Sequence, residues 1–149
     1  CRSVARNMAP SDPPLARAYL GLLAAALKDE RTSASEFAAA NALMEPDHLS
    51  RDTVWLFEGE AAAMRGDLAD AEVLVNKAVA RVREPGASRS PRSFIAGALR
   101  LLGGWKVAAG QKAESCSTLA EAREIYTEIG ATPGRLAVEG LLMAAACPA

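Results

Sequence analysis

One 24-residue pattern occurs twice in this chain, and it restricts the fold more than any other feature of the sequence. The segments WLFEGEAAAMRGDLADAEVLVNKA (55–78) and LRLLGGWKVAAGQKAESCSTLAEA (99–122) align without a gap, 44 positions apart. The alignment pairs Gly59 with Gly103, and a weaker copy upstream places Gly21 38 positions before Gly59. Further matches are Gly66 with Gly110, Ala78 with Ala122, and Phe37 and Ala40 with Val75 and Ala78. Internal repeats of this length predict a fold built from one supersecondary unit.

Composition and hydrophobic spacing both indicate that this unit is helical. Half of the residues are hydrophobic, but only 5% are aromatic. Abundant alanine and leucine are typical of tightly packed helices, whereas sheets favour β-branched and aromatic residues. Apolar residues recur at helical spacing in seven blocks. The sequence therefore predicts an all-α chain with helices at about 13–28, 33–44, 51–65, 68–83, 91–109, 112–129 and 133–146.

Prolines and glycines mark where these helices begin and end. Asp12, Ser90 and Thr132 each precede a proline, and a short polar side chain before a proline is typical of a helix N-terminus. Each of the three is therefore predicted to cap a helix. The stretch EPGASRS (84–90) is predicted to be a flexible connector, because Pro and Gly stop the preceding helix and small polar residues follow.

The matching glycines indicate how the helices of a pair pack. A glycine inside a helix costs about 1 kcal/mol relative to alanine, so Gly21, Gly59 and Gly103 at equivalent positions suggest a packing requirement. We predict that each lets the second helix of its pair approach closely. Gly66 and Gly110 are predicted to form the tight turns between paired helices.

These residues resemble the tetratricopeptide repeat, whose pattern is W-x2-L-G-x2-Y, a turn glycine, A-x3-F and a further small residue. The middle copy matches it at Trp55, Gly59, Gly66, Ala71 and Ala78, with Val75 in place of the aromatic residue. The last copy keeps Leu102, Gly103, Gly110, Leu119 and Ala122. The departures are Glu58 at the usual Leu, Ala62 at the usual Tyr, Ser115 at the usual first Ala, and periods of 38 and 44 that exceed 34.

The resemblance implies a right-handed solenoid of antiparallel helix pairs, about three hairpins plus a C-terminal helix. This repeat domain would cover residues 13–146, between a linker (1–12) and a tail (147–149). Trp55 would be a core residue. The segment from Gly110 to Leu142 is also similar to the long-period repeats of large ATP-binding LuxR-type bacterial regulators.

Several function classes are disfavoured by the sequence. The glycine-rich stretch LLGGWKVAAGQKAES (101–115) is not a phosphate loop, because five residues separate Gly104 from Gly110, the lysine follows Gln111, and no strand is predicted before it. The net charge of -1 supplies no positive field for nucleic acid. The longest apolar run, Leu15 to Leu27, is too short for a bilayer.

Candidates for chemistry are few. His48 is the only histidine and lies near Asp47 and Asp52, but without further ligands it favours a turn in which Ser50 or Asp52 caps a helix. Three widely spaced cysteines imply neither a disulfide framework nor a zinc site and fit a reducing cytoplasm. Lys112 precedes Cys116 by one helical turn, which would lower the pKa of an exposed thiol, although a structural cysteine is commoner. The arginines around the connector, Arg81, Arg83, Arg89 and Arg92, favour a solvated loop over an anion site.

We therefore expect no enzyme, no cofactor and no metal site, but a binding module of a larger bacterial signalling or regulatory protein. In the family that the chain resembles, the first helix of each pair lines a groove. Candidate groove residues are Leu22, Ala25, Leu56, Glu60, Met64, Arg100, Val107 and Leu141. This mostly apolar set suits an amphipathic helix or a hydrophobic peptide. The alternative is a small-molecule-sensing repeat domain of a LuxR-type transcription regulator, and self-association through the end helices is also expected from an incomplete solenoid.

Overall fold

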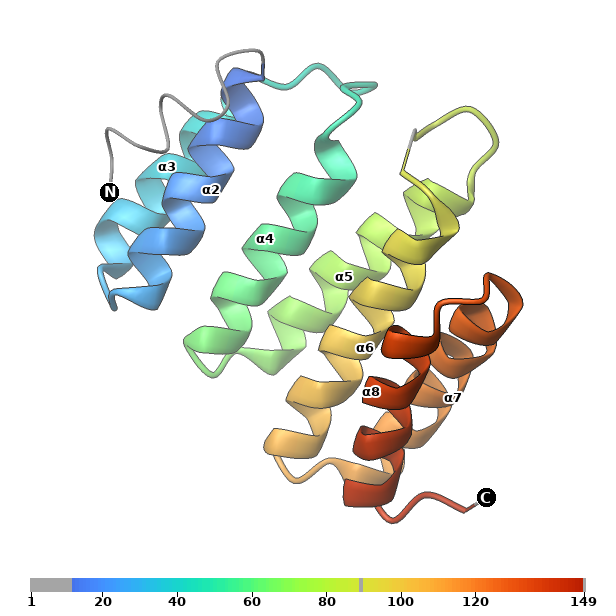
Figure 1. Cartoon of the computed structure of the whole chain (residues 1–149). Helices are drawn as coiled ribbons and strands as arrows, with labels where there is room; N and C mark the ends of the chain where they lie inside the picture. The colour runs from blue at the N-terminus through green and yellow to red at the C-terminus, as the bar shows by residue number, and fades with distance from the viewer. Residues whose placement is uncertain (1–11, 89, 149) are drawn as a thin grey trace. The chain divides into compact units, whose positions relative to one another are not determined.

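The computed structural model describes residues 12–88 and 90–148. Within these residues the chain forms seven α-helices, coloured from blue to red in Figure 1. They are α2 (Pro13–Ala26), α3 (Glu30–Ala42), α4 (Arg51–Met64), α5 (Leu68–Arg83), α6 (Arg92–Ala108), α7 (Lys112–Glu128) and α8 (Thr132–Ala144). The prediction of an all-α chain is confirmed. No helix among the described residues is both long and apolar enough to cross a membrane.

The chain divides into two compact units, Cys1–Arg89 and Ser90–Ala149. In the first unit, α2 packs on α3, α4 packs on α5, and α2 and α4 join the two pairs. In the second unit, α6 packs on α7, and α8 packs mainly on α7 and to a lesser extent on α6. Consecutive helices therefore pair within each unit, as antiparallel hairpins do. The boundary between the units falls inside the predicted connector, 84–90.

The same turn joins the helices of each pair, and it explains why the repeat glycines recur. Gly66 has a φ of 84° and donates its N–H to the Ala63 carbonyl, while Asp67 donates to the Ala62 carbonyl. This is the Schellman arrangement that closes a helix C-terminus through a left-handed residue. Gly110, with a φ of 80°, makes the equivalent turn after α6. The stretch 101–115 is thus the end of one helix, a turn and the start of the next.

Lys28 occupies the equivalent turn between α2 and α3, with a φ of 60° although it is not a glycine. Its N–H donates to the Ala25 carbonyl, and the N–H of Asp29 donates to the Ala24 carbonyl. Asp29 and Asp67 then cap the following helices, accepting from the N–H groups of Thr32 and Asp70 at 3.1 Å each. Helix α3 consequently begins at Glu30 rather than at 33.

Of the three predicted proline-associated caps, one is confirmed. The Asp12 carboxylate accepts from the Leu15 N–H at 3.1 Å. The prediction for Ser90 is wrong, because Pro91 is the N-cap residue of α6 and makes no side-chain cap bond. The prediction for Thr132 is also wrong, because this residue is the first of α8 and Ala131 precedes it as the cap.

The close approach of paired helices at the repeat glycines is confirmed. A Cβ placed on Gly21 would lie 2.9 Å from the Phe37 ring, and one placed on Gly103 would overlap the Leu119 side chain. Small residues line the same seams, and Ala40, Ala78 and Ala122 are all fully buried. Because native interiors are close-packed, the glycines are needed where the second helix presents a large side chain.

The prediction that Trp55 belongs to the core is wrong. Its neighbour Val54 is fully buried, whereas Trp55 is half-buried, and the guanidinium carbon of Arg51 lies 5.6 Å from the centroid of its ring. The first unit instead has a core of smaller side chains around Phe37, among them Ala18, Ala40, Val54 and Ala61. Trp55 therefore contributes a cation–π contact at the surface of α4.

Candidate functional site

A cleft of about 460 Å³ opens in the first unit between α3, α4 and α5. Its floor and walls combine apolar and charged side chains: Glu30, Ala34, Phe37, Ala38, Asn41, Glu58, Arg65, Asp70 and Leu74. Glu58 and Arg65, the C-cap residue of α4, lie on the same side of this helix, because seven residues make about two helical turns. The cleft lies within a single compact unit and is the candidate functional site of this chain.

Glu58 occupies a position where the repeat otherwise places a core leucine. In the alignment of the helix pairs, Leu20 and Leu102 stand at the same position, and they are only 8% and 2% exposed. Glu58 is half-buried and lines the cleft. Glu58 is thus a charged residue at a position where the other helix pairs have a buried leucine. Departures of this kind from apolar packing are commonly found at functional sites.

A neighbouring amide holds the Glu58 carboxylate in place. The Asn41 side-chain amide of α3 donates to Glu58 Oε1 at 3.2 Å and to the Phe37 carbonyl at 3.0 Å. The second of these bonds lies within α3 and fixes the amide relative to its own helix. The Glu58 carboxylate is thereby oriented at the junction of α3 and α4.

The electrostatic surroundings of Glu58 disfavour its ionised form. Burial raises its pKa above the ordinary value of 4.5, and the nearby Asp70 raises it further, whereas the Asn41 hydrogen bond and the charges of Lys77 and Arg65 lower it. The charged residues that line the cleft are three acidic ones, Glu30, Glu58 and Asp70, and one basic one, Arg65. The cleft therefore has an excess of negative charge.

The predicted groove residues lie elsewhere. Two residues along a helix turn the side chain by about 200°, so Leu56 and Glu60 stand on the other side of α4 from Glu58. Leu56 and Glu60 are half-buried, and so is Leu22 of α2. Ala25 is buried, and Met64 is 50% exposed. Burial raises the pKa of Glu60 as well. None of these residues lines the cleft, so binding on their face stays a prediction.

In the second unit, the predicted groove residues Arg100, Val107 and Leu141 are half-buried. The Leu141 side chain faces Gly104 of α6, because a Cβ on that glycine would lie 3.7 Å from Leu141 Cδ1. Leu141 therefore takes part in the packing of α8 on α6. The role of Arg100 and Val107 in partner binding stays a prediction.

Two arginines hold the loop between α3 and α4 through its backbone carbonyls. Arg51 donates to the Met44 and Glu45 carbonyls at 3.0 and 2.8 Å, and Arg81 donates to the His48 carbonyl at 3.0 Å. His48 Nδ1 accepts from the Ser50 N–H at 3.2 Å. The Ser50 side chain makes no cap bond and donates instead to Asp12. His48 thus lies in a hydrogen-bonded turn.

Of the other arginines near the connector, Arg92 pairs with Glu128 at 2.7 Å, and Arg89 lies outside the described residues. No group of three or more His, Cys, Asp or Glu side chains in the described part of the chain is placed to hold a metal ion.

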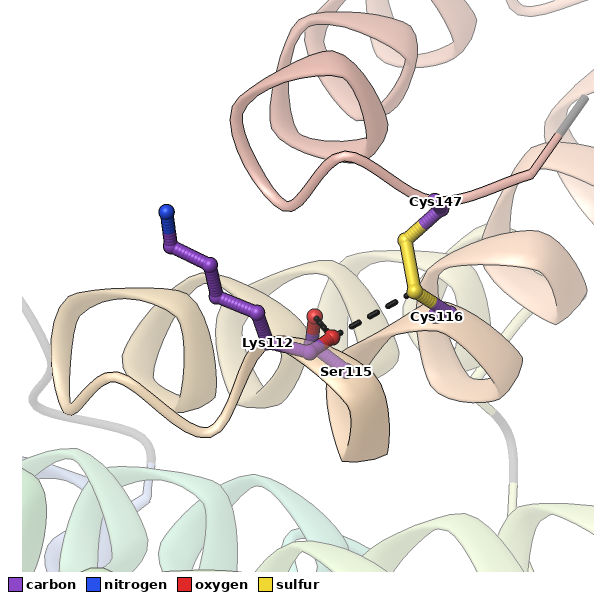
Figure 2. Close-up of a disulfide and its surroundings, with 4 residues drawn as sticks. All are labelled: Lys112, Ser115, Cys116 and Cys147. Carbon is purple, nitrogen blue, oxygen red and sulfur yellow. Dashed lines mark hydrogen bonds between the residues drawn. A yellow bond between two sulfur atoms is a disulfide. The ribbon is translucent and has the colours of Figure 1, made fainter.

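The expectation that the cysteines are unpaired is wrong for two of them. Cys116 in α7 and Cys147 after α8 form a disulfide, with their Cα atoms 5.6 Å apart, as Figure 2 shows. Cys116 is therefore not the titrating thiol that its spacing from Lys112 suggested. Wide sequence spacing hid the pair, because the 31 positions between them are spanned by a turn and two helices that bring the sulfurs together.

Comparison of the chain with protein-family models, with curated proteins and with solved structures finds no match. The structure itself shows a helical fold in which the described helices pack as consecutive pairs.

Proposed function

We propose that this chain is a non-catalytic repeat module of the tetratricopeptide-like class that binds a peptide segment of a partner protein. The class assignment has the support of equivalent contacts in the three hairpins. Phe37 packs at Gly21, Val75 at Gly59 and Leu119 at Gly103. Modules built from such hairpins present extended surfaces to which peptides bind.

The observation that carries the proposal is the position of Glu58. A leucine there would continue the packing of Leu20 and Leu102, whereas the carboxylate is desolvated and its pKa is raised. Keeping a half-buried charge in place of a core residue costs stability. A ligand that supplies a positive charge at this carboxylate would offset that cost.

The charges around the cleft indicate the chemistry of the occupant. The occupant we propose is a lysine or arginine side chain of the partner, whose aliphatic part lies on Phe37 and Leu74 and whose cation meets Glu58. Long basic side chains commonly bury their stems along apolar surface in this way. The excess of carboxylates around the cleft disfavours an acidic residue at the same place.

The test is selection of binding peptides from a random displayed library on the full chain, with two matched variants. Glu58→Leu restores the packing residue of the other repeats. Glu60→Leu removes a similarly half-buried carboxylate from the opposite side of the same helix. We expect peptides with a lysine or arginine next to apolar residues to be enriched on the wild type and on Glu60→Leu but not on Glu58→Leu. Enrichment lost only on Glu60→Leu would place binding on the predicted groove instead.

A second candidate function is sensing of a small cationic molecule, as in the repeat domain of a LuxR-type regulator. The volume of about 460 Å³ falls in the range of small-molecule sites. Saturable thermal stabilisation by spermidine or agmatine, abolished by Glu58→Leu, would favour sensing. Peptide enrichment without any such stabilisation would favour the protein-binding function.

A further inference from the structure

The disulfide lies at the edge of the second unit and joins the beginning of α7 to the end of α8. Cys116 is in the second turn of α7, and Cys147 follows Ala146, a left-handed residue two positions after the end of α8. Figure 2 shows the bond between these two elements. The N–H of Cys147 donates to the Leu142 carbonyl at 3.0 Å, so the cysteine is part of the C-terminal turn of α8. The bond therefore fixes the last turn of α8 on α7.

Apart from this bond, α8 has little buried surface. Val138 is the single buried residue that α8 contributes among those described, and Ala145 is buried just after it. Leu136 and Met143 of the same helix are 55% and 82% exposed. Elements with few buried contacts open at low free energy. The docking of the C-terminal end of α8 thus depends on the disulfide more than the packing of α6 or α7 does.

The bond is accessible to a thiol. Both cysteines are half-buried rather than enclosed, and a cavity of about 370 Å³ lined by Arg123, Met143 and Cys147 opens beside the bond. The largest buried side chains of this unit, such as Leu102 and Leu119, lie on the α6–α7 pair, and neither sulfur is among the buried groups. Exposed disulfides outside the core are the ones that exchange with thiols.

The reduced state of Cys116 would also find a partner without movement of α7. Its sulfur lies 3.3 Å from the Lys112 carbonyl oxygen. The oxidised sulfur carries no proton to donate, but the thiol of the reduced form does.

We propose that Cys116–Cys147 is a reversible redox modification site that controls the docking of α8. A thiolate of a dithiol reductant attacks one sulfur, the S–S bond breaks, and the other cysteine leaves as a thiolate. The second thiolate of the reductant then attacks the mixed disulfide, so that the reductant becomes the disulfide and both protein cysteines become thiols. Two electrons pass to the protein, and a low-molecular-weight disulfide reverses the reaction. This inference concerns the second unit and is independent of the peptide-binding proposal.

Reduction frees the end of α8 and uncovers the apolar surface beneath it. Gly134 packs on Tyr126 of α7, and Leu141 on Gly104 of α6. These contacts loosen when the covalent link is absent. The redox state of the two cysteines thereby sets how much of the α6–α7 pair is available to other molecules.

The test is hydrogen exchange on the full chain, oxidised with glutathione disulfide and then reduced with dithiothreitol under native conditions. Thiol alkylation in each state checks the chemistry: of the three cysteines, at most one should react after oxidation, because glutathione disulfide can also cap the third thiol, and all three should react after reduction. We expect reduction to speed exchange in 132–147 by about tenfold or more, while the interiors of α6 and α7 change little. Reoxidation should restore the slow exchange.

Three results would overturn the proposal. The first is three reactive thiols after oxidation, and the second is a bond that dithiothreitol reduces only in denaturant. The third is full reduction without faster exchange in α8. Cys147→Ser should reproduce the reduced pattern in both conditions, and Cys1→Ser, which removes the third cysteine, should behave as the wild type.

Discussion

Leu119 of α7 fills the space that a side chain on Gly103 of α6 would occupy. Phe37 stands in the same relation to Gly21, and Val75 to Gly59, and the members of each pair are 16 positions apart in the sequence. The interval of 44 or 38 positions between repeats therefore preserves a contact and not just a residue type. The packing of a side chain of the second helix on a glycine of the first explains why the sequence pattern repeats.

Replacement of Gly103 by alanine should destabilise the second unit. The added Cβ collides with the fully buried Leu119. Overpacking of this kind costs roughly 1 to 3 kcal/mol, and the better helix propensity of alanine returns about 1 kcal/mol of that. Gly140→Ala is the matched control, because a Cβ there meets nothing within 4 Å and should stabilise α8. Urea unfolding followed by Trp105 fluorescence in a Trp55→Phe background measures both. Equal effects of the two variants would refute the packing role of Gly103.

Lys28 offers a stabilising substitution. It holds the left-handed turn conformation that Gly66 and Gly110 hold in the other hairpins, and a side chain in that region costs roughly 1 kcal/mol. Lys28→Gly should therefore raise the free energy of unfolding of the first unit by about 1 kcal/mol, and Gly66→Lys should lower it by a similar amount. Thermal unfolding, monitored by circular dichroism, tests whether Lys28→Gly stabilises the first unit and Gly66→Lys destabilises it. A destabilised Lys28→Gly would mean that the lysine side chain makes a contact worth more than the strain.

The stability of the first unit should depend on the ionisation of Glu58. Its pKa in the folded state is raised, chiefly by burial, so folding disfavours the ionised form. The stability associated with its protonated form is complete below the ordinary pKa of 4.5 and is lost as pH rises through the raised value. Glu58→Gln should accordingly gain stability over the wild type at neutral pH and lose that advantage in acid.

Asn41→Ala provides a second check on Glu58. Its amide hydrogen bond lowers the Glu58 pKa, so its removal should shift the pH dependence further upward. Urea midpoints measured across the pH range report both variants. An advantage of Glu58→Gln that does not change with pH would show that the carboxylate charge is not the cause.

The disulfide should contribute substantially to the stability of the second unit. Closing a loop across 31 positions corresponds to roughly 3 to 4 kcal/mol in the chain-entropy treatment. Cys147→Ser should lose up to that amount relative to the oxidised wild type. With dithiothreitol present, the wild type should fall to the level of the variant. A difference that persists under reduction would indicate that the serine disturbs the end of α8 itself.

Much of the fold could be predicted because helix periodicity and glycine spacing are local signals. All seven predicted helices occur, with ends within a few residues of those expected. The start of α3 was misplaced because its turn residue is Lys28, and a lysine rarely adopts a left-handed conformation. The proposed caps Ser90 and Thr132 failed because each helix begins one or two residues away from the position that the proline suggested.

The candidate site was less predictable, because it depends on contacts between separate elements. Glu58 stood out in the sequence only as a departure from the repeat pattern, and its bond to Asn41 links α4 to α3 across 17 positions. The Cys116–Cys147 pair likewise depends on the folding of α8 back onto α7. The resemblance to the tetratricopeptide repeat predicts Trp55 in the core, but its helix presents Val54 there instead.

The most direct test of the account is a double-mutant cycle between Glu58 and the basic residue of a selected peptide. Dissociation constants are measured by calorimetry for the wild type and Glu58→Gln, each with the peptide and with a version whose lysine is replaced by norleucine. The account predicts a coupling energy of about 1 kcal/mol or more, because the cation and the half-buried carboxylate meet in the cleft. A coupling energy near zero would show that the peptide binds without contacting Glu58 and would contradict the proposed site.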